Sequence, residues 1–142
     1  MPNALYDTGR EGFLAGECDY DTATIKASLV RGGSFVTTHK FVSDLVAAGG
    51  VLHGTPMTLT GKTVAGGVAD ALDGSFSTPP ANATGHVIVI YQSSAVSGGA
   101  DVATTAQRLV AWIDSYTGLP VTPNGADIAV TWPNDTNRIF RL

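Results

Sequence analysis

Alternating apolar and polar positions recur along most of this chain, and the pattern predicts strands. Ile25, Ala27 and Leu29 alternate with polar residues, which is typical of a half-buried strand. Residues 86–92 form a strand-like run that is apolar on both faces, which predicts a central strand. Further strand-like runs, separated by turn residues, lie at 51–60, 62–69, 75–77, 107–114, 127–132 and 138–142. About eight short strands predict a mainly β protein, an antiparallel β-sandwich or jelly-roll in one domain covering residues 1–142.

Residues 3–15 have helical spacing and predict a short N-terminal helix with Asn3 as its N-cap. Two glycines weaken this helix by about 1 kcal/mol each relative to alanine. A helix this short is marginal in isolation. We therefore expect its apolar residues Leu5, Phe13 and Leu14 to dock on the sheet of the same domain or on a neighbouring molecule.

Turn signals suggest how the strands connect. The region 35–46 is ambiguous, and its spacing favours a second short helix. Asp73-Gly74 and Asn124-Gly125 are typical of tight hairpin turns. After a further turn, residues 138–142 are expected to fold back on 127–132 as a C-terminal hairpin. Either Ile139 or Phe140 then belongs to the core and the other faces outward.

The composition of the chain disfavours some classes of protein. The 142 residues include 8 basic and 12 acidic side chains, a formal net charge of −4, and only 14% are charged. A typical domain has about 25%. This balance disfavours a disordered chain and a nucleic-acid-binding protein. No apolar run reaches the roughly 18 residues of a membrane span, and no targeting segment is visible, so we expect no membrane partner.

No motif in the sequence assembles a catalytic or metal site. Residues 59–63 end like a phosphate-binding loop, but Pro56 stands where the earlier glycine belongs. Cys18 is the one cysteine, which excludes an internal disulfide and a multi-cysteine zinc site. Asp19 and Asp21 alternate like calcium ligands, without the rest of a calcium loop. The three histidines, His39, His53 and His86, are widely spaced. We expect neither enzymatic activity nor a cofactor.

The two ends of the chain carry its most specific runs. The first is residues 1–14, MPNALYDTGREGFL. The second is residues 118–128, GLPVTPNGADI, followed by Trp132, Asn134 and residues 137–142, NRIFRL. These runs resemble a family of small virion proteins of tailed bacteriophages. Looser matches between them extend the resemblance over nearly the whole chain.

This resemblance implies a structural part of a virion, made in the host cytoplasm, without catalytic residues. We expect a capsid cement or decoration protein on the outer surface of the head. Its expected partners are the major capsid protein and other copies of itself, as a homo-oligomer on the particle. The expected assembly contacts are Leu5, Phe13, Leu14 and Phe140.

An alternative is a tail- or fibre-associated phage protein that binds host glycans. Trp112 and Trp132 could line a sugar-binding cleft, although tryptophans in strands are more often core residues. Burial of both indole rings would argue against this alternative.

Overall fold

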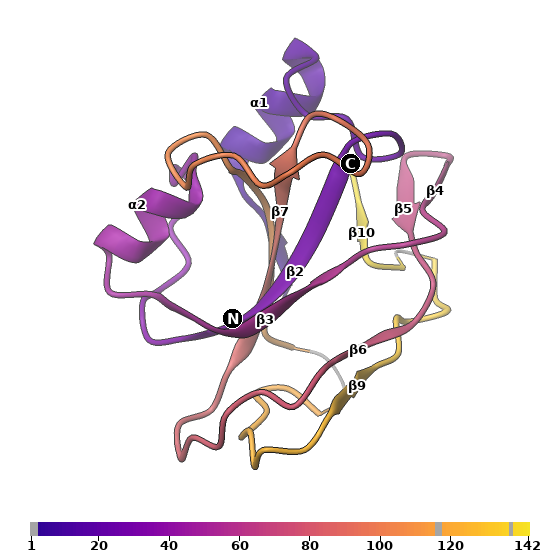
Figure 1. The fold of residues 1–142 in the computed structure, drawn as a ribbon. Helices are drawn as coiled ribbons and strands as arrows, with labels where there is room; N and C mark the ends of the chain where they lie inside the picture. The colour runs from indigo at the N-terminus through magenta and orange to yellow at the C-terminus, as the bar shows by residue number, and fades with distance from the viewer. Residues whose placement is uncertain (1–2, 116–117, 137) are drawn as a thin grey trace.

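The computed structural model describes residues 3–115, 118–136 and 138–142, and the fold is mainly β (Figure 1). An antiparallel sheet of five strands forms its centre. In spatial order, the strands are β1 (Ala4–Leu5), β8 (Arg108–Ile113), β7 (Val87–Ser94), β2 (Thr24–Arg31) and β3 (Val51–Thr58). Strand β7 lies in the middle of this sheet, as its continuous apolar run predicts.

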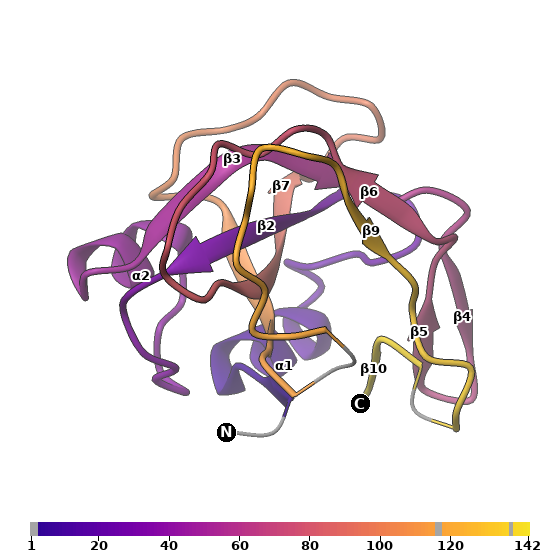
Figure 2. The ribbon, with the colours of Figure 1, turned by 90° about the horizontal axis from the view of Figure 1, so that it is seen from below.

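Smaller antiparallel pairings lie against one face of the central sheet and complete the sandwich. One is a three-stranded sheet of β10 (Phe140–Arg141), β5 (Val68–Asp70) and β4 (Thr63–Ala65). The other pairs β6 (Gly74–Phe76) with β9 (Ile128–Val130). Figure 2 shows β6 beside β9, and β10 beside β5. The predicted antiparallel β-sandwich with a short N-terminal helix is confirmed.

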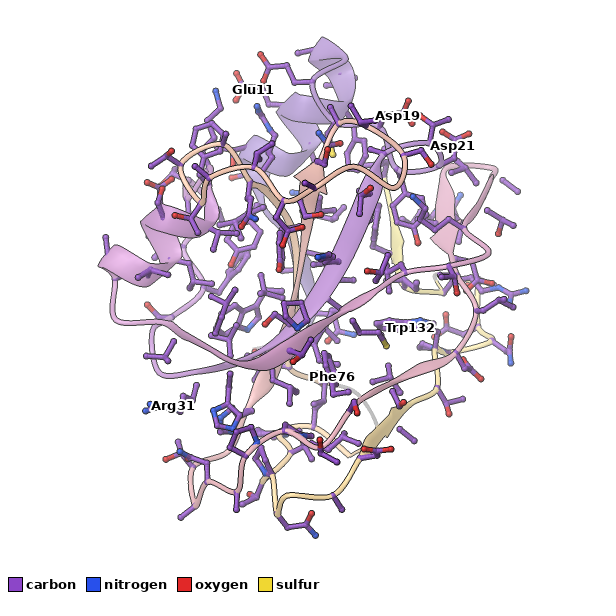
Figure 3. All side chains as sticks on the ribbon, in the orientation of Figure 1. Glu11, Asp19, Asp21, Arg31, Phe76 and Trp132 are labelled. Atoms are coloured by element: carbon purple, nitrogen blue, oxygen red, sulfur yellow. The ribbon has the colours of Figure 1, made fainter. Side chains whose placement is uncertain are left out.

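Both faces of the central sheet are buried, each by a different layer. On one face, Ile25 and Ile90 belong to a core cluster with Phe76 and Trp132 from the smaller layer. Figure 3 shows Phe76 and Trp132 in the interior of the molecule. The opposite face is covered by a second cluster whose buried members are Tyr6, Val30, Val42, Leu45, Val89, Tyr91, Leu109 and Trp112. Strand β2 is therefore buried on both faces rather than half-buried, and even Ser28 is fully buried.

The N-terminal helix α1 is shorter than predicted and runs over Asp7–Ala15. The residues before it form β1, which pairs with β8. Asn3 is therefore not the N-cap. Its side-chain oxygen instead accepts hydrogen bonds from the backbone N–H groups of Asp114 and Ser115, at 3.1 and 3.0 Å. Because Leu5 belongs to β1, the apolar residues of this region do not form one helical face.

Two glycines allow α1 to lie directly on β8. Gly9 and Gly12 are the buried residues of the helix. A Cβ at Gly9 would lie 2.9 Å from the carbonyl oxygen of Leu109, and one at Gly12 would overlap the Arg108 side chain. Arg108 itself is 4% exposed and forms an ion pair with Glu17. The residues that weaken the isolated helix are thus the ones that permit its close packing.

The second helix, α2, is confirmed and runs over Val42–Ala47. The Asp44 carboxylate accepts hydrogen bonds from the backbone N–H groups of Phe41 and Lys40, both at 2.9 Å. These bonds lower the pKa of Asp44 and fix the start of the helix. Val42 and Leu45 are fully buried, so α2 covers one face of the central sheet.

Several predicted turns connect different strands from those expected. Residues 62–69 are not one strand, because Gly66 and Gly67, both at positive φ, turn the chain between β4 and β5. Asp73-Gly74 does not close a hairpin, since β5 pairs with β4 and β10 while β6 pairs with β9. Asn124-Gly125 does not close one either, because the partner of β9 is β6.

The C-terminal strand also pairs differently from the prediction. Phe140 lies opposite Ala69 in β5, so the expected hairpin with 127–132 is wrong. Ile139 and Phe140 are both buried, with exposed fractions of 4% and 8%. Strict alternation does not apply, because Ile139 precedes a strand of only two residues. The ring of Phe140 packs edge-on against Tyr20, with centroids 5.3 Å apart.

The edges of the central sheet are short or irregular. At one edge, β1 contributes two residues. At the other, β3 contains Gly54 at a φ of +72° and Pro56, and its register against β2 shifts between Ala27 and Leu29. A proline cannot donate a ladder hydrogen bond, and a bulge bends the strand that contains it. Neither edge is therefore a long, regular strand.

We expect Gly9→Ala to lower the free energy of unfolding by roughly 1 kcal/mol, although alanine favours helix. Overpacking typically costs about 1–3 kcal/mol, which exceeds the gain of about 1 kcal/mol in helix propensity. Leu14→Ala is the control on the same helix, because Leu14 is 91% exposed. Urea denaturation of both variants tests this, and equal midpoints would contradict the close docking of α1.

Ile139→Ala and Phe140→Ala should both destabilise the domain, by about 2–5 and 3–5 kcal/mol respectively, because both side chains are buried. Arg141→Ala is the matched control, since Arg141 is exposed and its loss should cost less than about 0.5 kcal/mol. Thermal unfolding followed by circular dichroism gives the ranking. A parent-like melting temperature for either core variant would show that the C-terminal strand is not docked.

Candidate functional site

A cleft opens between the two layers of the sandwich beside β1 and β8. It is open to one side and has a volume of about 1110 Å³, slightly above the usual range of about 300–1,000 Å³ for small-molecule pockets. Leu29, Ile88 and Ile113 of the central sheet form one side. Ile128 and Val130 of β9 form the other. The walls are therefore aliphatic and come from both layers.

Residues from both ends of the chain line this cleft. Asn3, Leu5 and Arg10 come from the N-terminal run, and much of the remaining lining comes from residues 118–141. The two runs that carry the resemblance to phage virion proteins are thus neighbours in the fold. Residues 1, 2 and 137 of those runs lie outside the described part of the chain.

Charged residues line the rim of the cleft: Arg10, Arg138, Arg141 and Asp135. Two of these arginines have acidic partners nearby. Arg10 lies 3.0 Å from Asp7, and Arg138 lies 3.1 Å from Asp70. Because these pairs offset two of the positive charges, the rim is polar rather than strongly cationic.

The described lining holds few groups that can perform catalysis. Ser115 and Thr131 supply its hydroxyl groups, and no histidine or cysteine is among the described lining residues. A hydroxyl without an adjacent base is a weak nucleophile. The aliphatic walls are themselves packed into the core, with Leu29, Ile88 and Val130 at most 4% exposed. The accessible part of the cleft is therefore mostly its polar rim.

Three of the four expected assembly contacts are packed inside the domain. Leu5 and Phe140 are buried, and half-buried Phe13 lies with its ring centroid 5.9 Å from that of Phe140. The structure brings these three together where the N-terminal and C-terminal segments meet, so they stabilise the fold. Leu14, by contrast, is 91% exposed at the end of α1.

Both tryptophans are buried. Trp112 is 7% exposed, and its Nε1 donates a hydrogen bond to Asp114 Oδ2 at 3.0 Å. Trp132 is 3% exposed. Although both contribute to the cleft lining, their low exposure leaves little ring face for a sugar to stack on. This burial disfavours the glycan-binding alternative.

Lys62 of the 59–63 motif and Asp19 of the Asp19–Asp21 pair each contact neighbouring groups of the fold. The ammonium group of Lys62 donates to the carbonyl oxygen of Ala23 and lies 5.8 Å from the ring centroid of Tyr20. The Asp19 carboxylate accepts from the hydroxyl and backbone N–H of Thr22, at 2.6 and 3.3 Å. Figure 3 shows Asp19 close to Asp21 at the surface.

The described residues hold neither a metal-ligating cluster nor a membrane-spanning helix. None of their His, Cys, Asp and Glu side chains gather in groups of three or more that could hold a metal ion. None of their helices has the length and apolar character needed to cross a membrane.

Two histidines that are distant in the sequence are neighbours in the fold. The ring centroids of His53 and His86 lie 4.5 Å apart. Strand β2 brings them together, because Leu29 pairs with His53 and Val30 pairs with Val87. The wide spacing of the histidines in the sequence carries no signal of this contact, because it does not reveal which strands pair.

Cys18 should react slowly with thiol reagents in the native protein. It is 5% exposed, and burial raises its pKa to about 12. Since the thiolate is the reactive form, we expect little reaction with Ellman's reagent at about pH 8 until urea unfolds the chain. The absorbance time course in both states provides the test. Rapid stoichiometric labelling of the native protein would contradict the burial of this thiol.

Comparison with known proteins identifies no relative. No family model, no curated protein and no solved structure matches the chain. The resemblance of the two end runs to phage virion proteins therefore stays a prediction.

Proposed function

We propose that this chain is a structural protein of a bacteriophage virion, a cement or decoration protein that binds the outer surface of the head. One observation carries the proposal: the two runs that resemble phage virion proteins meet at a single cleft. A cement protein needs a stable fold with a contact surface and no reaction centre. The small antiparallel sandwich and the polar rim of its cleft are compatible with that requirement.

Exposed apolar side chains on the surface could form an assembly contact. Leu14 on α1 is 91% exposed, and Val96 in the loop after β7 is 66% exposed. Burying such side chains against a capsid surface stabilises a complex without new charge pairs. We propose Leu14 as part of the contact with the major capsid protein. Leu5, Phe13 and Phe140 act indirectly, by holding α1 on the domain.

The proposal is tested by adding the purified protein to heads of the parent phage that lack it. We expect cosedimentation with the heads and extra density on the head exterior by electron cryomicroscopy. Density on the tail, or failure to bind heads, would contradict the proposal and favour the tail-associated alternative.

Leu14→Ser should weaken head binding at least tenfold without changing the melting temperature. The matched control is Leu72→Ser, which removes another exposed leucine (64%) from the connection between β5 and β6. Equal binding by the parent and both variants would exclude Leu14 from the contact.

High salt should not release the protein from heads. Only 14% of the residues are charged, so the contact is expected to depend on apolar and neutral polar groups. At about 1 M salt the Debye length is only about 3 Å, which screens exposed charge pairs. Sedimentation of decorated heads in low and high salt measures retention. Complete release in high salt would show that charge pairs dominate the contact.

A further inference from the structure

Three basic side chains gather at one end of the central sheet, and none of them is among the described residues that line the cleft. His53 lies opposite Leu29 in the β2–β3 register. Val30 pairs with Val87 in the antiparallel β2–β7 register. Continuing that register by one residue places Arg31 opposite His86. Side chains at opposed positions leave the same face of a sheet, with Cβ atoms about 4.5–5.5 Å apart. Figure 3 shows Arg31 at the periphery of the molecule.

Backbone carbonyl groups fix the tautomers of both imidazole rings. His53 Nε2 lies 2.6 Å from the carbonyl oxygen of Pro80, and His86 Nδ1 lies 2.6 Å from that of Thr84. A carbonyl oxygen only accepts hydrogen bonds, so these two nitrogens carry the protons. In neutral His86, Nε2 therefore presents a lone pair.

Two buried polar atoms of this cluster lack hydrogen-bond partners among the residues that the structure describes. His86 is fully buried, and its Nε2 has none. The Nε of Arg31, a donor on the neighbouring strand, also has none. Unpaired buried polar atoms are costly, and each such atom in a native fold calls for a ligand, water or ion. The two orphan atoms stand on adjacent strands, on the same face of the sheet.

Among the described residues, no carboxylate forms an ion pair or hydrogen bond with Arg31, His53 or His86. The positive charge of this cluster is therefore not neutralised by a direct acidic partner there. The segment 78–85 packed beside it contains no titratable side chain. Asp127 on the facing layer accepts from the Thr78 backbone N–H at 2.7 Å. Burial lowers the pKa of His86. The hydrogen bond to the Thr84 carbonyl group raises this pKa, whereas the nearby positive charges of His53 and Arg31 lower it further.

We propose that Arg31, His53 and His86 form a binding site for a small oxyanion, with proton uptake at His86. The oxyanion accepts hydrogen bonds from Arg31 Nε and from His86 Nε2, which takes a proton from solvent when the anion binds. Both orphan atoms are then satisfied as donors. The guanidinium charge of Arg31 favours an anion over a metal cation, although two imidazole rings are close together.

Without an anion, the cluster should make folding sensitive to acid. The pKa of His86 is lower in the folded protein than in the unfolded chain, where it is about 6.5. Stability is therefore complete above about pH 6.5 and decreases below it, since the unfolded chain takes up the proton first. A bound oxyanion raises the pKa of folded His86 and counteracts this loss.

Imidazole NMR spectra of the full chain, titrated from about pH 8 to about pH 5, test the proposal with sulfate as the probe. We expect about 10 mM sulfate to raise the pKa of His86 by about one unit relative to chloride of equal ionic strength, a tenfold preference for the protonated form. His39 is the internal reference, because it lies outside the cluster. Phosphate and acetate in parallel samples distinguish a tetrahedral anion from a carboxylate.

Arg31→Gln should abolish the sulfate effect, while Arg10→Gln, a change at an exposed arginine, should leave it intact. The melting temperature at about pH 5.5 should rise with sulfate in the parent and not in Arg31→Gln. Three results would overturn the proposal. They are an unchanged pKa of His86 in sulfate, an equal shift at His39, or a sulfate effect that persists in Arg31→Gln.

Discussion

Burial of both faces of β7 and β8 is the constraint on which the rest of the architecture depends. All six residues of β8 and seven of the eight in β7 are buried. A sheet of this kind needs a cover on each side. The smaller strands cover one face with Phe76 and Trp132, and α2 with Tyr6 covers the other. The cleft lies beside β1 and β8, where the layer of smaller strands does not extend over the edge of the central sheet.

Arg108 shows how the N-terminal segment is fixed to this sheet. Its guanidinium donates to the carbonyl oxygen of Thr8 at 2.8 and 3.1 Å and pairs with Glu17. Gln92 on the adjacent strand reinforces this attachment, since its side chain bonds the backbone of Glu17 and Asp19 at 3.2 and 2.9 Å. A buried charge removed from its partners is strongly destabilising. The segment from α1 to β2 is therefore held by polar contacts as well as by packing.

Local patterns predicted the fold class, the helix α2, the central position of β7 and the approximate limits of most strands. They failed where pairing is non-local. Phe140 pairs across to Ala69 rather than to the preceding strand, and Asp73 accepts from the backbone N–H of Trp132 at 2.8 Å instead of forming a hairpin turn. The meeting of His53 and His86 depends on the same strand order. Periodicity reports which residues are buried, but strand partners are chosen by the packing of the whole sandwich.

The irregular edges of the central sheet limit how a second chain can pair with it. Pro56 and the bend at Gly54 interrupt β3, so another chain would find few consecutive backbone groups with which to extend the sheet. Exposed sheet edges are a common route by which β-proteins join edge to edge into open-ended fibres. The interrupted edge of β3 restricts that route, so a contact made there has to use side chains, whose shapes select one geometry.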